Sequence, residues 1–124
     1  MEIQVYRDQQ GFDLLRDEWN ILVQSSYRNN FFNTWEWQRT WWAHLGRGEL
    51  WLIALRAGDG SLVGLAPLYR PPLGEGASRL RLVGGREVSD YLDLIVTAGQ
   101  EQVVCAALLD FLESDAAPPW DVLE

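Results

Sequence analysis

Two carboxylates and a phenol lie close together in the segment Ser-Asp-Tyr-Leu-Asp-Leu at residues 89–94. The stretch from Tyr91 to Val96 is predicted to form a strand, and alternation along it puts Tyr91 and Asp93 on one face. Asp90 falls at the junction between loop and strand. An Asp-Tyr-Asp group at the mouth of a strand could bind a hydroxyl-rich or amine substrate, or orient a base. The same residues are also typical of a turn followed by a solvated strand face.

The second candidate is the aromatic segment at residues 31–37, Phe-Phe-Asn-Thr-Trp-Glu-Trp. Exposed tryptophans can stack on sugar rings or other planar ligands. The alternative is that these side chains belong to the core, on a helix that lies under a sheet. Glu36 follows Asn33 by three residues, which is the position of the acid in a capping box. We therefore interpret Glu36 as a cap partner rather than a catalytic acid.

The chain contains one cysteine, Cys105, and one histidine, His44. A single cysteine excludes an internal disulfide framework and a cysteine zinc cage, and a single histidine argues against a histidine-rich metal site, so we expect no metal. Cys105 lies in an apolar helical segment and is predicted to be a small buried side chain rather than a nucleophile. His44 has no serine, cysteine or acid at the spacing of a catalytic pair.

The charge balance is acidic, with a formal net charge of -8 over 124 residues, and all ten basic residues are arginines. An acidic chain with scattered arginines would repel a nucleic-acid backbone, so we expect no nucleic-acid partner. No apolar run approaches the roughly 20 residues that span a bilayer, and the N-terminus lacks a signal-peptide pattern. We therefore expect no membrane insertion and a cytoplasmic location. The length fits one domain.

Hydrophobic periodicity predicts the elements that position these residues. Glu2 to Tyr6 has the pattern of a strand. A helix is expected to open near Gly11, because apolar residues then recur at spacings of three and four; these are Phe12, Leu15, Trp19 and Leu22. A second helix is expected to begin with Asn33 as its N-cap and to run to about Leu45, where Gly46 would end it.

The middle of the chain predicts a hairpin and further strands. Apolar runs at 50–56 and 62–69 flank an Asp-Gly pair, which is typical of a β-hairpin. Pro67 lies inside the second run and cannot donate to a ladder, so we expect an edge, a bulge or an early end there. A strand is expected at 79–83, followed after the strand at 91–96 by a third helix that Thr97 caps and that runs through Ser114.

The last residues, from about Trp120, resemble the start of a strand. The predicted order of strand, helix, helix, antiparallel strands, helix and strand is an α/β arrangement. A strand cut this short buries little surface and leaves open ladder positions. We therefore interpret residues 1–124 as one domain whose final strand is truncated, as in a fragment or the first half of a larger protein. The alternative is a natural short protein whose end pairs with a partner subunit, as in a homodimer in which two chains complete each other's sheet.

Five segments in order resemble the GNAT-fold acyltransferase superfamily, and more narrowly the CelD-type group of cellulose-biosynthesis proteins, which are relatives of the Fem peptidyltransferases. No segment is specific alone, but together they cover essentially the whole chain. Such proteins usually carry two GNAT-like halves, and this sequence matches the first. The segments are Phe12…Glu18-Trp19-Asn20…Leu22, Phe32-Asn33-Thr34-Trp35-Glu36-Trp37…Trp41-Trp42, Leu62-Val63-Gly64-Leu65-Ala66-Pro67-Leu68, Leu80-Arg81-Leu82-Val83-Gly84 and Ser89-Asp90-Tyr91-Leu92-Asp93.

The resemblance implies a GNAT-like mixed, mainly antiparallel sheet flanked by about three helices. It implies transfer of an acyl group from acetyl-CoA or another acyl-CoA to an amine or hydroxyl of a small molecule or envelope precursor. The acyl-CoA would lie mainly against a second GNAT-like half. This half would contact the acceptor through Asp90, Tyr91 and Asp93, with Trp37 as a wall, and no catalytic base is identified.

The sequence departs from the family in one respect. The pyrophosphate-loop pattern, Arg/Gln-x-x-Gly-x-Gly/Ala before a helix, is not matched by residues 81–86, Arg-Leu-Val-Gly-Gly-Arg. A strand, not a helix, is expected to follow them, whereas a phosphate cradle needs backbone N–H groups that open a helix. The alternative to an acyltransferase is therefore a non-catalytic GNAT-like binding or assembly module.

Overall fold

A computed structural model describes residues 1–26, 30–72, 79–84, 93–118 and 122–123 of the chain. Its strands form one sheet with the spatial order β1-β2-β3-β4-β6, and β5 also pairs with β3. All pairs are antiparallel except β4 and β6, which are parallel. The strands are β1 (Glu2–Tyr6), β2 (Glu49–Arg56), β3 (Leu62–Arg70), β4 (Arg79–Leu82), β5 (Ile95–Val96) and β6 (Val122–Leu123).

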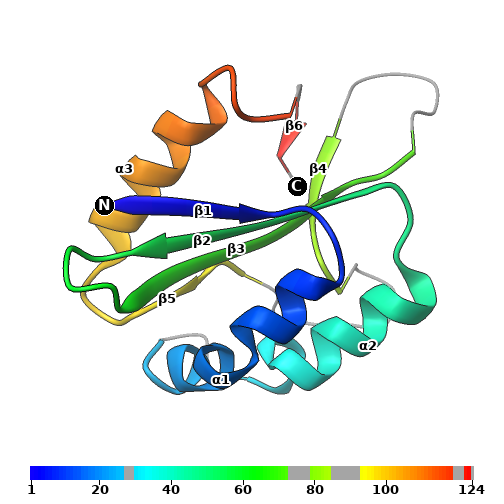
Figure 1. Cartoon of the computed structure of the whole chain (residues 1–124), viewed down its shortest axis with the longest axis horizontal. Helices are drawn as coiled ribbons and strands as arrows, with labels where there is room; N and C mark the ends of the chain where they lie inside the picture. Colours follow the sequence, from blue (N-terminus) through cyan, green and yellow to red (C-terminus); the bar gives the residue numbers. More distant parts are fainter. Residues whose placement is uncertain (27–29, 73–78, 85–92, 119–121, 124) are drawn as a thin grey trace.

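Three helices cover the two faces of this sheet (Figure 1). Helices α1 (Gln10–Gln24) and α2 (Trp35–Leu45) lie on one face, joined through a 3₁₀ turn, η1 (Phe31–Asn33), and α3 (Glu101–Leu112) lies on the other. The expected α/β class, with a mainly antiparallel sheet and three helices, is confirmed. Among the described residues, no helix is both long and apolar enough to cross a membrane.

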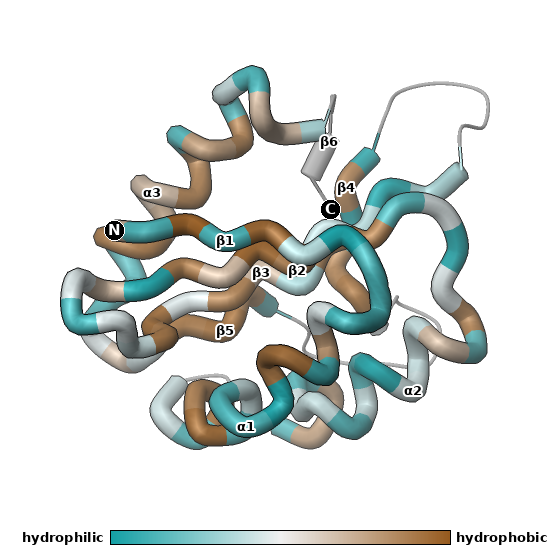
Figure 2. Tube along the Cα trace, in the orientation of Figure 1, coloured by the Kyte–Doolittle hydropathy of each residue, from teal (hydrophilic) through white to brown (hydrophobic). Residues whose placement is uncertain are grey.

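The central strands are buried on both faces, which explains their nearly continuous apolar sequence. In β2, Leu50, Leu52 and Ala54 pack toward α1 and α2. Their neighbours Trp51, Ile53 and Leu55 pack toward α3. In Figure 2 the trace is brown along much of the strands and along parts of the helices. The sheet therefore separates two apolar clusters, one under each helical layer.

The first helix forms where the periodicity predicts it. The four side chains of the predicted apolar face, Phe12, Leu15, Trp19 and Leu22, are all buried. Gly11 allows the start of α1 to pack against the end of β1, because a Cβ atom at this position would lie 2.4 Å from the Cβ atom of Tyr6. The direction of α1 across the sheet is thus set at its first turn.

The second helix begins one residue later than expected. Thr34, not Asn33, is the N-cap, and its hydroxyl accepts a hydrogen bond from Trp37 N–H at 3.4 Å. Asn33 is fully buried in the 3₁₀ turn, and its carbonyl accepts a hydrogen bond from Trp19 Nε1 at 2.9 Å. This contact with α1 holds Asn33 in the turn. The helix ends at Leu45 with Gly46 as its C-cap, as predicted.

The third helix is shorter than expected. Thr97 does not cap it, because Thr97 N–H donates to Val63 O at 2.9 Å and so continues the sheet. A turn at Gly99, with φ of 92°, separates this extended residue from Glu101, where α3 begins. The helix packs tightly on β3 at Gly64, because a Cβ atom there would lie 2.6 Å from Val104 Cγ1.

Pro67 lies in the middle of β3, which continues to Arg70. Its carbonyl accepts a hydrogen bond from Val83 N–H at 2.8 Å, so its nitrogen faces the same neighbouring chain segment. That segment does not continue along β3: β4 pairs with Leu68 and Tyr69, whereas β5 pairs with Gly64 and Leu65. The missing N–H of Pro67 therefore faces a gap in the pairing of a central strand, and of the expected edge, bulge or early end, the strand shows only this local interruption on one side.

Candidate functional site

Of the predicted site residues, Asp93 lies beside the interruption of pairing along β3. Val83 bonds to Pro67 and Ile95 pairs with Leu65, and the Asp-Tyr-Asp group falls between these two points in the sequence. Asp90 and Tyr91 lie outside the described residues, so Asp93 is the member of the group whose position is known. In the described part of the strand expected at 91–96, Ile95 and Val96 pair with β3, whereas Asp93 and Leu94 do not. Asp93 therefore precedes the strand rather than alternating along it.

Asp93 is held at the point where the chain returns to the sheet. It is half-buried, and its Oδ1 atom accepts a hydrogen bond from Leu94 N–H at 2.8 Å. This bond fixes one carboxylate oxygen immediately before β5. A half-buried carboxylate fixed in this way can accept a hydrogen bond from a hydroxyl or amine.

Trp37 belongs to an aromatic cluster, which we define as Phe31, Phe32 and Trp37. The Trp37 ring lies 5.3 Å from each phenylalanine ring, measured between centroids. Phe31 is 62% exposed and Trp37 is half-buried, so the aromatic cluster is partly open to solvent. The sequence left open whether these side chains lie in the core or on the surface. The aromatic cluster does not lie in the core under the sheet, whereas Trp41, later in α2, does.

Buried polar contacts hold the aromatic cluster in place. Gln38 is 1% exposed, and its Nε2 atom donates to Phe32 O at 3.1 Å. The bond from Trp19 to Asn33 O fixes the next residue. Glu36 does not complete a capping box; its carboxylate accepts a hydrogen bond from Asn20 of α1, and this bond is the main reason why its pKa is lowered. Contacts from both helices thus position the turn that carries the phenylalanines.

Backbone bonds place the connection between α1 and α2 beside the end of β5. Ala98 N–H donates to Ser25 O at 2.8 Å, and Ser26 forms a bridge with Thr97. The structure thus brings together the segments that precede the aromatic cluster and follow Asp93. It describes no contact between Trp37 and Asp93 themselves.

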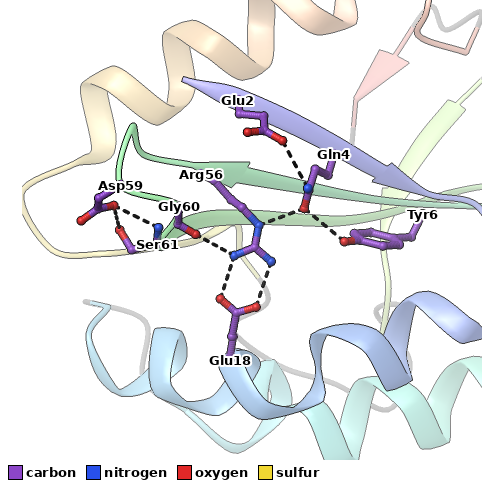
Figure 3. A network of polar contacts seen from close by, with 8 residues as sticks. All are labelled: Glu2, Gln4, Tyr6, Glu18, Arg56, Asp59, Gly60 and Ser61. Atoms are coloured by element: carbon purple, nitrogen blue, oxygen red, sulfur yellow. Dashed lines mark hydrogen bonds and ion pairs between the residues drawn. The ribbon is translucent and has the colours of Figure 1, made fainter.

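A polar network joins α1 to the turn end of the hairpin formed by β2 and β3 (Figure 3). Arg56 of β2 forms a bidentate ion pair with Glu18, with N–O distances of 2.7 and 2.8 Å. It also donates to Gln4 Oε1 at 2.9 Å and to Gly60 O at 3.0 Å. The hydrogen bond from Arg56 lowers the pKa of Glu18, and the same bond raises the pKa of Arg56. We call this pair the Arg56–Glu18 clamp; sequence reasoning missed it because the two residues are 38 positions apart.

The start of α3 already has an anionic partner. The Glu101 carboxylate accepts hydrogen bonds from Gly99 N–H at 2.9 and 3.2 Å. A carboxylate at a helix N-terminus is favoured by the helix dipole, as a phosphate would be. The N–H group of Gly99 is therefore engaged within the protein.

Comparison with known proteins adds no assignment. No family model matches the sequence, and no curated protein is significantly similar to it. Within the described ranges, no three or more His, Cys, Asp or Glu side chains are grouped so that they could hold a metal ion. A functional argument therefore rests on the Asp93 region, the aromatic cluster and the way the sheet positions them.

Proposed function

We propose that this chain is the acceptor-side half of a GNAT-type N-acyltransferase that moves an acyl group from acyl-CoA to an amine or hydroxyl. The observation that carries the proposal is the interrupted edge of β3, where Asp93 returns to a mainly antiparallel sheet beside the connection between α1 and α2. Helix α3 lies on the face of the sheet opposite α1 and α2, and β6, which follows it in sequence, pairs in parallel with β4; this arrangement also supports the proposal. The cytoplasmic location that we propose would supply the acyl-CoA.

In the proposed reaction, the acceptor nitrogen or oxygen attacks the carbonyl carbon of the thioester. A C–N or C–O bond forms, the C–S bond breaks, and coenzyme A leaves as the thiol after taking up the proton that the acceptor loses. Asp93 accepts a hydrogen bond from the acceptor and holds the attacking atom in place. The aromatic cluster forms an apolar wall on the acceptor side, with Trp37 as one member. Asp90 and Tyr91 stay proposed acceptor contacts.

The start of α3 supports placing the acyl-CoA elsewhere. A CoA pyrophosphate would need free N–H donors at a helix N-terminus, and here the Glu101 carboxylate engages Gly99 N–H and adds negative charge. We propose that a second GNAT-like half supplies the acyl-CoA site, because a second copy of this chain would carry the same Glu101 carboxylate at the start of α3. The same observation favours the alternative function, a non-catalytic binding or assembly module, if no such half exists.

The test is acceptor-dependent release of coenzyme A from acetyl-CoA by the full-length gene product, measured with a thiol reagent across a panel of amines and alcohols. Asp93→Asn keeps the size of the side chain but removes its charge. We expect it to raise the acceptor KM by about tenfold, the loss of one charged hydrogen bond, with the acetyl-CoA Kd unchanged. Asp110→Asn, on the exposed side of α3, is the matched control.

Two results would overturn the proposal. Release of coenzyme A that no acceptor stimulates, from protein that circular dichroism shows to be folded, would favour the binding module. Equal kinetics of Asp93→Asn and wild type for both substrates would remove Asp93 from the acceptor site.

A further inference from the structure

A surface cleft of about 550 Å³ lies at the end of the sheet where β1 ends and β2 begins. Figure 1 shows that the connection after β1 and the connection between α2 and β2 lie at the same end of the sheet, and both contribute residues to the lining. The volume is large enough for one small ring compound, in a shallow depression that is open to solvent and not enclosed. Its lining includes Arg7, Asp8, Gln10, Trp42, Gly48 and Glu49.

The walls of the cleft are fixed by the backbone and by packing. Gly48 has φ of 92°, and a Cβ atom there would lie 2.1 Å from Arg70 O. The Trp42 ring packs against Tyr69, with 5.7 Å between centroids. Gly46 covers part of the same ring, because a Cβ atom there would lie 2.3 Å from Trp42 Cε3. The half-buried indole therefore has a defined orientation.

The charges around the cleft are compensated within the protein. Arg7 stacks on Trp51 with 3.7 Å between its Cζ atom and the ring centroid, and its Nε atom donates to Leu50 O at 3.2 Å. The Glu49 carboxylate lies 3.8 Å from Arg7 and 3.4 Å from Arg70. An added anion would compete with Glu49 for both arginines, and an added cation would compete with both arginines for Glu49. The cleft is therefore poorly suited to either kind of ion.

The first turn of α1 offers no free anion site either. Asp8 Oδ1 accepts from Gln10 N–H at 3.0 Å, and Asp8 O accepts from Gly11 N–H at 3.0 Å. Phe12 N–H donates to Gln9 O at 3.1 Å. A phosphate at this helix end would find its donors engaged and a carboxylate beside them.

Neutral hydrogen-bonding groups remain available. The Gln10 side chain is exposed, and among the described residues neither its amide nor the Trp42 indole N–H has a partner. Asp8 and Glu49 add carboxylate oxygens that can accept from hydroxyl groups. An aromatic ring beside an amide and carboxylates matches a ring compound with C–H groups on its face and hydroxyls on its edge.

We propose that this cleft binds a neutral saccharide, with the sugar ring against Trp42 and its hydroxyls hydrogen-bonded to Gln10 and the nearby carboxylates. The site lies at the start of β2, away from Asp93, which precedes a strand paired with the first half of β3. It therefore does not depend on acyl transfer. Its readout is binding, so failure of one proposal leaves the other standing.

The test is a titration of the ¹⁵N-labelled chain with glucose and N-acetylglucosamine, followed through the Trp42 indole N–H resonance. We expect a saturable shift with a millimolar Kd, which is typical of a site with few hydrogen bonds. Gln10→Ala should weaken binding by roughly fivefold, the loss of one hydrogen bond. Gln102→Ala, an exposed glutamine in the first turn of α3, is the matched control and should bind as wild type does. Trp42→Phe should abolish the saturable response, read from the remaining amide resonances.

Three outcomes would overturn the proposal. The first is no saturable shift with either sugar up to about 100 mM, well above a millimolar Kd. The second is a tighter response to adenosine, inorganic phosphate or spermidine than to either sugar. The third is equal weakening by Gln10→Ala and Gln102→Ala.

Discussion

The Arg56–Glu18 clamp should contribute a measurable coupling energy to the stability of the fold. A hydrogen bond to a charged group contributes about 1.5–3 kcal/mol, whereas an exposed ion pair contributes about 0.2–1 kcal/mol. The Arg56 side chain is 15% exposed and the Glu18 side chain is 41% exposed, so this pair is intermediate. After allowing for solvent screening of Glu18, we expect a coupling of about 1–1.5 kcal/mol.

The measurement is a double-mutant cycle with Glu18→Gln, Arg56→Met and the double variant, using urea unfolding followed by tryptophan fluorescence. Arg56→Met alone should cost more than Glu18→Gln, because Gln4 and Gly60 also lose a donor. The control cycle uses Asp13 and Arg39, which are 3.4 Å apart with side chains 62% and 40% exposed. That pair should couple by no more than about 0.5 kcal/mol.

The clamp also predicts a dependence on pH. The hydrogen bond from Arg56 holds the pKa of Glu18 below its ordinary value of 4.5. A pKa that is lower in the folded state gives stability that is fully present above pH 4.5 and lost as pH falls through the folded-state pKa. The difference between wild type and Glu18→Gln should therefore shrink as pH falls below 4.5. A difference that stays equal from pH 7 to pH 3, or a coupling no larger than that of the control pair, would refute the reasoning.

Two further substitutions test the close packing at glycines. Gly64→Val should lower the free energy of unfolding in urea by about 1–3 kcal/mol, because its side chain would meet Val104 of α3. Val104→Ala in the same chain should recover part of that loss. No recovery would mean that α3 is not the obstacle. Gly48→Ala should lower the free energy of unfolding by about 2–4 kcal/mol, because the positive φ and the nearby Arg70 O both oppose a Cβ atom. Gly58→Ala is the control and should change stability little, because a Cβ atom there meets nothing within 4 Å.

The parts of the fold that follow from local patterns could be predicted from the sequence. The buried face of α1 follows from apolar residues spaced along one helix, and the hairpin follows from two apolar runs around Asp59 and Gly60. These signals depend on neighbours a few positions apart, so the sequence contains all of the information.

The parts that depend on distant contacts could not be predicted. Asn33 has the sequence signature of an N-cap, but a hydrogen bond from Trp19, 14 residues away, holds it in a 3₁₀ turn. Thr97 looks like a cap, but its backbone pairs with Val63 of β3. In the candidate site, the chemistry of the Asp93 and Trp37 side chains could be read from the sequence. The position of Asp93 could not, because the interruption beside Pro67 depends on the register of β3, β4 and β5.

The contacts that fix α1 make stability and binding separable. Gly11 packs the start of the helix on Tyr6, near the cleft. Trp19 fixes the turn that carries Phe31 and Phe32 of the aromatic cluster. In the Arg56–Glu18 clamp, Glu18 lies between Gly11 and Trp19 along α1. The clamp holds α1 to the turn end of the β2–β3 hairpin, where no proposed ligand contact lies. Loosening the clamp should therefore lower the free energy of unfolding without changing the affinity of the cleft or the acceptor KM, because the contacts at Gly11 and Trp19 still position both regions.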